Sequence, residues 1–184
     1  MESSTIQTLK ANVTQEEAVR TFRSRGVSAL YWRMRSGPLR RVADVYVPFW
    51  MYRVQYEMNG VARARIFAMD AVHAALDLFE FASVPDADQV MTVVTRNRLG
   101  ARLEASLAEE RLRTKVLRVL FQQGFFKLRA LSVTIERLPM EIHLPYWLAF
   151  YGHGEAARLR VMDATRRRIE GGKASAFFEE WLAA

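Results

Sequence analysis

The sequence predicts an α+β fold made of two tandem pseudo-symmetric units, each with a helix, three antiparallel strands and a second helix. Three observations support this prediction: a motif that occurs twice, segments in which apolar and polar residues alternate, and segments with apolar residues at helical spacing. Alternation with period two is typical of a half-buried strand, and spacing of three and four residues is typical of an amphipathic helix. At 184 residues the chain is long enough to bury a core without a disulfide or a metal.

The repeated motif is a proline, an aromatic residue and a tryptophan, at residues 48–50 and again at residues 145–147. The two prolines are 97 residues apart. Two further matches occur in the same order with an offset of 93 residues: Met69–Ala71 with Met162–Ala164, and Glu16–Thr21 with Glu109–Thr114. This order indicates a tandem duplication, with a first repeat at residues 14–83 and a second at 97–184. The alternatives of one fused core and two independent cores stay open.

Each repeat is expected to begin with a helix. The first starts at Thr14, because Thr14 and Glu17 have the spacing of a capping box, and it ends at Gly26. Its apolar face consists of Ala18, Val19 and Phe22. The second helix is longer and ends at Gly124. Its apolar residues recur at steps of three to five: Leu99, Leu103, Leu107, Leu112, Val116, Leu120 and Phe121.

Strands are expected next, where apolar and polar residues alternate. They cover residues 30–35 in the first repeat, and 131–136 and 140–144 in the second. A turn at residues 36–38 follows the first of these strands. Pro139 is expected in a turn between the other two, because proline cannot donate to a strand ladder.

The clearest hairpin joins residues 50–58 to residues 62–69. A two-residue loop would place Tyr56 opposite Arg63 and so mix apolar with polar side chains on one face. We therefore expect a three-residue loop, Met58–Gly60, with the glycine in the left-handed conformation of a bulge.

Both Met-Asp-Ala motifs end a strand. Asp70 and Asp163 are therefore expected to cap short helices at residues 71–77 and 164–170, each accepting from backbone N–H groups two or three residues on. Gly171-Gly172 ends the second of these helices.

Two segments complete the expected elements. Residues 84–95 stay ambiguous, since Val-Met-Thr-Val-Val-Thr favours a strand whereas the surrounding charges suit a helix. Residues 175–184 predict an amphipathic helix whose apolar residues are Phe177, Phe178, Trp181 and Leu182. Among them, Phe177 and Trp181 are candidates for a surface that contacts a protein partner or a second copy.

This layout resembles the PepSY-type, cystatin-like module, in which the last strands carry a Tyr-x-Val pattern and end in Asp-Ala. The residues that carry the resemblance are Tyr52–Val54, Met69–Ala71 and Met162–Ala164, so it covers the two strand regions. Members of that family are mostly exported, whereas this chain lacks a signal sequence. It also departs from the family in its proline-aromatic-tryptophan motifs and its many arginines.

Composition restricts the chemistry. The absence of cysteine excludes disulfides, thiol nucleophiles, cysteine zinc sites and iron–sulfur clusters. The chain has no run of 18 apolar residues that would indicate a membrane span, and its first residues lack the apolar core of a secretory signal. We therefore expect a cytoplasmic protein.

No residue pattern predicts an enzyme or a cofactor. The histidines show no metal-binding spacing, and no nucleophile elbow, phosphate loop or dinucleotide fingerprint occurs. Glu141, His143 and Asp163 form an alternative metal site, although His143 reads more simply as a strand residue and His153 as a turn residue. Asp70 and Asp163 form an alternative acid–base pair, but their context after a strand favours capping.

The charge of +7 favours acidic partners of some kind. Basic residues gather late in the second repeat and are candidates for contacts with an anion or a nucleic acid: Arg158, Arg160, Arg166, Arg167, Arg168 and Lys173. Nucleic acid and an anionic membrane surface are thus alternatives. The interpretation favoured over both is a non-enzymatic binding or assembly module that acts through protein–protein contacts.

Overall fold

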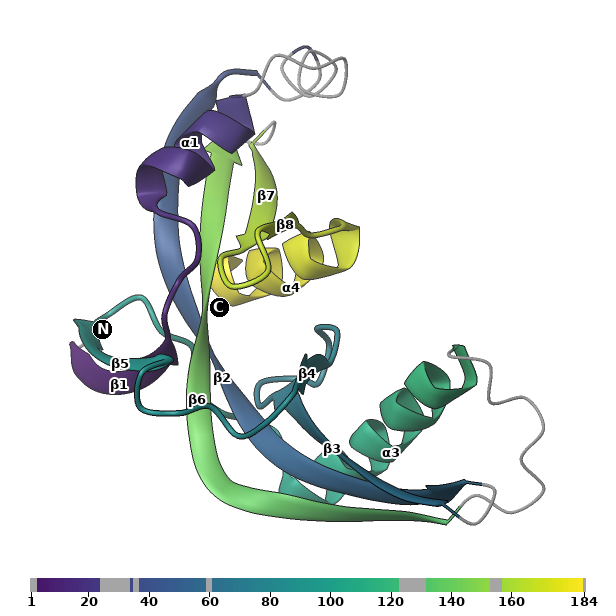
Figure 1. The fold of residues 1–184 in the computed structure, drawn as a ribbon. Helices are drawn as coiled ribbons and strands as arrows, with labels where there is room; N and C mark the ends of the chain where they lie inside the picture. Colours follow the sequence, from purple (N-terminus) through teal and green to yellow (C-terminus); the bar gives the residue numbers. More distant parts are fainter. Residues whose placement is uncertain are drawn as a thin grey trace. The chain divides into compact units, whose positions relative to one another are not determined.

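The structure is a computed structural model that describes residues 3–23, 34, 37–58, 61–122, 132–152 and 157–183 (Figure 1). Its described part is α+β, as predicted. In chain order the elements are β1 (Ser4–Leu9), α1 (Gln15–Arg23), β2 (Leu39–Met58), β3 (Val61–Asp70), β4 (Phe79–Phe81), β5 (Val90–Thr95), α3 (Ala105–Gln122), β6 (Val133–Tyr151), β7 (Arg158–Asp163), β8 (Arg168–Ile169) and α4 (Gly172–Ala183).

The strands form one mixed sheet in the order β4-β3-β2-β6-β1-β5, and β7 pairs with both β6 and β8. The hairpins β2–β3 and β6–β7 are antiparallel, whereas β1 runs parallel to β6, with Thr8 opposite His143. The N-terminal strand was not predicted. Its signal is the short alternation in Ser4–Leu9, where Ile6 and Thr8 are buried and Gln7 between them is exposed.

The chain divides into two compact units. The terminal unit consists of residues 1–47, 91–99 and 143–184, and the middle unit consists of residues 48–90 and 100–142. Each compact unit therefore draws on both predicted repeats.

Both long strands pass from one unit to the other. The division falls directly before Pro48 in β2 and between Ile142 and His143 in β6, three residues before Pro145. A proline within a strand removes a ladder donor, so it weakens pairing at that point. The predicted turn at Pro139 is wrong, because β6 continues through it from Val133 to Tyr151.

The core of the middle unit lies between α3 and the β2–β3 hairpin (Figure 1). The helix contributes Ala108, Leu112, Val116 and Leu120, and the hairpin contributes Trp50, Tyr52, Val54, Tyr56, Phe67 and Met69. Each of these larger side chains contributes about 1.5–3 kcal/mol when buried, so the packing of the helix on the hairpin stabilises the unit.

The core of the terminal unit uses α1 in the same way. Residues of α1 and of the segment before it pack against Ala149, Tyr151 and Met162 of the β6–β7 hairpin. The Tyr151 hydroxyl donates to the Phe22 carbonyl (3.0 Å), and Trp147 Nε1 donates to the Val13 carbonyl (2.9 Å).

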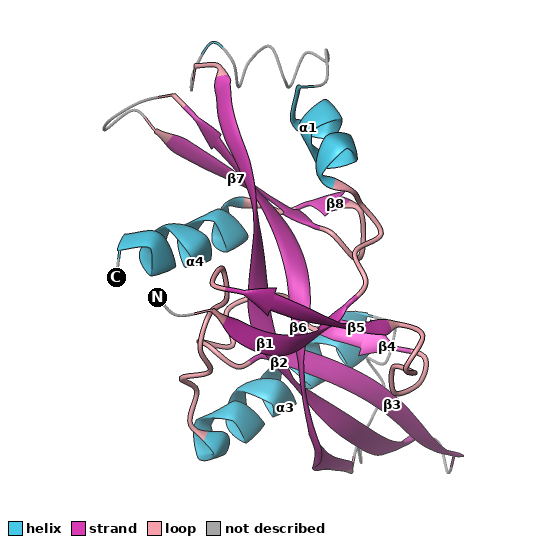
Figure 2. Ribbon diagram, turned by 90° about the vertical axis from the view of Figure 1, so that its left-hand side faces the viewer, coloured by secondary structure: helices cyan, strands magenta, loops and turns pink. Residues whose placement is uncertain are grey.

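Helix α4 belongs to the same unit and packs beside β7 (Figure 2). Its Phe178 ring contacts Tyr146 with ring centroids 5.4 Å apart. Tyr146 is adjacent in β6 to Trp147, so the two rings point to opposite faces of the strand.

The start of α1 confirms the predicted capping box. The Thr14 N–H donates to the Glu17 carboxylate (2.8 Å), and the Glu17 N–H donates to the Thr14 hydroxyl (3.3 Å). The predicted apolar face is also correct, since Ala18 and Phe22 are buried. In the second repeat the helix begins at Ala105, so the expected helical start near Leu99 is wrong.

The predicted three-residue hairpin loop is also wrong. Met58 pairs with Val61 and Tyr56 with Arg63, so the loop has two residues. Arginines can share a face with aromatic rings because their stems are apolar. Here the Arg65 guanidinium carbon lies 5.8 Å from the centroid of the Tyr56 ring, and the same group pairs with Glu80 at 3.1 Å.

The short helices expected after the two Met-Asp-Ala motifs are turns. Residues 71–74 and 164–167 form hydrogen-bonded turns, and the strands β4 and β8 follow them. In each turn the fourth residue after the aspartate has a left-handed backbone, with φ of 50° at Ala74 and 55° at Arg167. A left-handed residue cannot continue a right-handed helix, which explains why the helices do not form.

The remaining expectations concern single segments. The ambiguous residues 84–95 contain the strand β5. The strand expected at residues 30–35 lies outside the described residues except for Met34, which is exposed. Also outside them are Gly26, the loop residues 59–60, Gly124, Leu131 and His153.

We expect Ala74→Gly to change the free energy of unfolding little, because removal of a buried methyl group is offset by relief of the left-handed backbone, which costs a non-glycine residue about 1–2 kcal/mol. Ala71→Gly is the matched control, since Ala71 is buried in the same turn and has no left-handed backbone. It should destabilise by about 1–2 kcal/mol more than Ala74→Gly in urea denaturation. Equal losses at both positions would contradict the strain at Ala74.

Candidate functional site

The six candidate basic residues all lie in the terminal unit. Each of the three consecutive arginines lies near a different acid: Arg166 near Asp163 (3.8 Å), Arg167 near Glu17 (3.7 Å) and Arg168 near Glu170 (2.9 Å). Arg158 and Arg160 lie on β7, and Lys173 is exposed on α4. Each of the three central arginines thus has an acidic side chain of its own chain nearby.

The expected partner surface on the last helix needs a correction. Phe177 is 4% exposed and packs edge-on against Phe178 at 5.0 Å between ring centroids, so it belongs to the core. Trp181 is half-buried and still reaches the surface. The amphipathic pattern is correct, but the face that includes Phe177 is the one that packs against the sheet.

The alternative metal site gains no support from the placement of its residues. His143 is buried in β6, where its carbonyl accepts from the Thr8 hydroxyl (2.9 Å). Glu141 accepts a hydrogen bond from Trp50 Nε1 (3.2 Å). Within the described ranges, no group of three or more histidine, aspartate or glutamate side chains is arranged to hold a metal ion.

Asp70 and Asp163 have the capping role that was predicted, although they cap turns. Asp70 accepts from the backbone N–H groups of His73 (2.9 Å) and Leu76 (2.8 Å), one on each carboxylate oxygen. Asp163 accepts through a single oxygen from the N–H groups of Thr165 (2.8 Å) and Arg166 (2.9 Å). These bonds satisfy buried donors, so both carboxylates have a structural role.

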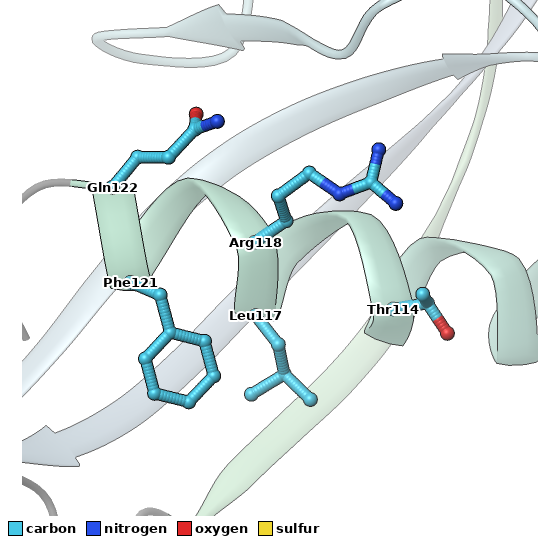
Figure 3. A pocket seen from close by; sticks show the side chains of 5 residues that line it. All are labelled: Thr114, Leu117, Arg118, Phe121 and Gln122. Atoms are coloured by element: carbon cyan, nitrogen blue, oxygen red, sulfur yellow. The ribbon is translucent and has the colours of Figure 1, made fainter. Parts of the chain in front are cut away.

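A depression of about 410 Å³ lies on the outer side of α3 (Figure 3). Its described lining consists of Thr114, Leu117, Arg118, Phe121 and Gln122. Leu117 and Phe121 project together on one side of the helix, and Arg118 and Gln122 project together on another (Figure 3).

Residues of this outer face continue along the helix at a regular spacing, three of them apolar (Leu107, Leu117 and Phe121) and two polar (Glu110 and Thr114). Leu107, Glu110, Thr114, Leu117 and Phe121 follow one another at steps of three, four, three and four residues. This is the a/d spacing of a helix that pairs with another helix, and we call these five residues the α3 stripe. Phe121 is 43% exposed and Leu107 38%, so large apolar side chains remain in contact with solvent.

Sequence reasoning missed this stripe because it assigned all the leucines of the segment to one face. In the structure Leu112, Val116 and Leu120 point to the core, whereas Leu107 and Phe121 do not. The sequence contains the signal. Leu107 and Phe121 are 14 residues apart, about four helical turns, so they share a face of the helix, and Leu112 lies on a different face.

A second hollow of about 300 Å³ lies beside α1 in the terminal unit, lined by Val13, Glu17, Arg20, Thr21, Met162 and Arg167. The N–H of Thr14 and the nearby arginines lower the pKa of the Glu17 carboxyl, which therefore stays charged. The Glu17 carboxylate pairs with Arg167, and Arg167 Nε also donates to the Asn12 carbonyl (2.7 Å). The charged groups of this hollow are thus already paired, since Arg20 lies 3.8 Å from Glu16.

Tyr46 takes part in a polar cluster of the terminal unit. Its backbone bonds to Asn97 (2.9 Å) and Leu99 (2.9 Å), and the Asn97 side chain donates to Asp44 (3.1 Å). Burial and the adjacent Asp44 carboxylate raise the pKa of the Tyr46 phenol to about 12. Burial also raises the pKa of Tyr52 and of Tyr151.

Comparison of the chain with family models, with curated proteins and with solved structures gives no match. Across the described residues, no helix has the length and hydropathy needed to span a bilayer.

The geometry of the two aspartates predicts unequal tolerance to asparagine. Asp163→Asn keeps the one oxygen that accepts from these N–H groups and loses only the long 3.8 Å ion pair with Arg166, so it should cost about 1 kcal/mol, whereas Asp163→Ala should cost more. Asp70→Asn removes one of two acceptors and leaves a buried N–H unpaired, at a cost of about 1–3 kcal/mol. Thermal denaturation of the four variants measures this order. Equal effects of asparagine at both positions would show that the number of accepting oxygens is not decisive.

The raised phenol pKa predicts a loss of stability in alkali. Below pH 10 Tyr46 is protonated in both the folded and the unfolded state, and between pH 10 and about 12 only the unfolded state ionises, so the free energy of unfolding should fall. Tyr46→Phe should make that fall shallower without abolishing it, because Tyr52 and Tyr151 contribute in the same direction. Urea denaturation at pH 8 to 12 tests this. An unchanged pH profile in Tyr46→Phe would contradict it.

Proposed function

We propose that this chain is a non-enzymatic binding module that acts through protein–protein contacts, and that the α3 stripe is its contact surface. The proposal rests on two exposed apolar residues of this helix, Leu107 and Phe121. Leu117 lies between them at the spacing of helices that pair, and a depression of about 410 Å³ lies beside Leu117 and Phe121. The opposite face of α3 already packs on the hairpin, so the stripe is free to bind a further element.

The spacing and the charge define the partner as an amphipathic helix with acidic flanks. Knobs at a/d spacing fit the holes of a second helix. Arg118 borders the stripe, so carboxylates beside the partner's apolar residues would meet positive charge. The net charge of +7 favours the approach of such a partner over long range.

Nucleic acid is the weaker alternative. Its best candidates were Arg166, Arg167 and Arg168, and each lies near an acid of its own chain. The free energy needed to break these ion pairs would offset part of the free energy gained from contacts with phosphates. Placement in the cytoplasm and the resemblance to the PepSY-type module remain predictions.

We also infer that the two repeats arose by duplication, which the matching hairpins support. Trp50 lies opposite Met69, and Trp147 lies opposite Met162. The residue after each aspartate donates to the carbonyl of the motif proline, at 2.8 Å from Ala71 and 3.1 Å from Ala164. Each aspartate caps the turn that follows, and each turn contains a left-handed residue at the same position.

In this arrangement each repeat supplies the helix that covers the hairpin of the other. Helix α1 packs on β6–β7, and α3 packs on β2–β3. The first helical bonds start from Thr14 and Glu104, 90 residues apart, whereas Glu16–Thr21 and Glu109–Thr114 match by sequence at an offset of 93. Three residues are nearly one turn, which is why the charge patterns matched by sequence.

Photo-crosslinking tests the contact surface. With the photoreactive analogue benzoylphenylalanine in place of Phe121, we expect one discrete crosslinked protein in the cells that make this chain. Mass spectrometry should place the crosslink in an acidic amphipathic helix. Arg118→Glu should lower the yield about tenfold, the effect of roughly 1.4 kcal/mol.

The matched control is the same analogue at Arg113, which is exposed on α3 but lies off the stripe. It should give little product. The same products at both positions, or none at Phe121, would refute the α3 stripe as a binding surface.

A further inference from the structure

The strand β5 forms one edge of the sheet, where β1 is its neighbour (Figure 2). Gln7 Nε2 of β1 donates to the Thr92 hydroxyl of β5 (3.0 Å), which ties the two strands together. Among the described strands, no other one pairs with β5. Its second edge therefore presents backbone N–H and C=O groups that a further strand could pair with.

The edge has none of the devices that usually prevent such pairing. Residues 90–95 contain no charge, no proline and no glycine, and five of the six are β-branched residues with high strand propensity. Val94 is 70% exposed and Met91 43%. An exposed apolar edge strand without charges can pair with an added strand of another chain. If it stayed unpaired, it would promote aggregation.

The segment is also complementary to itself. When two copies run antiparallel with Thr92 opposite Thr92, Val90 lies opposite Val94 and Met91 lies opposite Val93. All the apolar residues thus pair with apolar residues, and such cross-strand pairs stabilise a sheet.

The flanking charges point to the same register. Asp88 precedes β5 by two residues, and Arg96 follows it directly. Both are exposed. The antiparallel register that centres on Thr92 brings Asp88 of one copy toward Arg96 of the other, twice by symmetry. A parallel arrangement would instead place like charges together.

We propose that β5 is a dimerisation edge, at which two copies of this chain join their sheets by antiparallel pairing of residues 90–95 about a twofold axis at Thr92. This goes beyond the proposed function because it uses residues other than the α3 stripe. Six residues per copy bury less than the roughly 1,600 Å² of a standard interface, so the dimer is reversible, with dissociation at about micromolar concentrations.

Single cysteines test the register directly, because the chain has no cysteine of its own. Thr92→Cys places the thiol opposite its own copy at about 4.5–5.5 Å between Cα atoms, within disulfide range. It should give a disulfide dimer under mild oxidation. Val94→Cys is the matched control: it is more exposed, but the two thiols would lie four residues apart along the strands, about 13 Å. It should give no dimer.

Charge reversal provides a second measurement. In sedimentation velocity of the full chain, Asp88→Arg and Arg96→Asp should each weaken dimerisation about fivefold, and the double variant should restore it. Val94→Lys should abolish dimerisation while leaving the circular dichroism melt unchanged, because residue 94 projects into solvent.

A chain that is monomeric up to about 100 µM, a hundred times the expected dissociation constant, overturns the proposal. Disulfide dimers of both Val94→Cys and Thr92→Cys would also overturn it, because they would indicate parallel pairing of the two strands. A double charge-reversal variant that fails to restore dimerisation would overturn it as well. Val94→Lys should keep the photo-crosslink at Phe121. Loss of dimerisation without loss of the crosslink, or the reverse, therefore shows whether the β5 edge or the α3 stripe has failed as a contact surface.

Discussion

A cross-strand pair of tryptophan and methionine contributes to the core of each compact unit, with Trp50 buried and Trp147 half-buried. Trp50 lies opposite Met69 in one hairpin and Trp147 lies opposite Met162 in the other. Each pair belongs to a core that a helix completes. Each indole N–H also finds an acceptor, and the Arg137 guanidinium carbon lies 3.8 Å from the centroid of the Trp50 ring. Each indole ring buries a large apolar area while its N–H group keeps a hydrogen bond, which helps the hairpin hold its helix in place.

The helix that covers each hairpin comes from the other predicted repeat. Neither repeat therefore has a complete core of its own, and the chain must bring both halves together before either core is buried. Long-range contacts of this kind slow folding, because the entropy of closing the chain is lost before the contacts form. Pro48 lies at the point where β2 passes from the terminal to the middle unit, and Pro145 lies three residues after the last residue of β6 in the middle unit.

The two surfaces that we propose for contacts differ in what they offer a partner. The α3 stripe offers side chains at helix spacing, so its specificity comes from knobs and flanking charges. The β5 edge offers backbone groups, so its specificity comes from register and from the charges at residues 88 and 96. A module with both could bind one partner through a helix while it pairs with its own copy through a strand.

Local signals in the sequence were sufficient for the α+β class, the capping box at Thr14 and the capping role of Asp70 and Asp163. Each depends on contacts within a few residues, which the order of residues specifies directly. The two-residue hairpin loop, the continuous strand through Pro139 and the burial of Phe177 were decided by tertiary structure. In each case a distant element determines which face is covered, and local periodicity carries no information about that element.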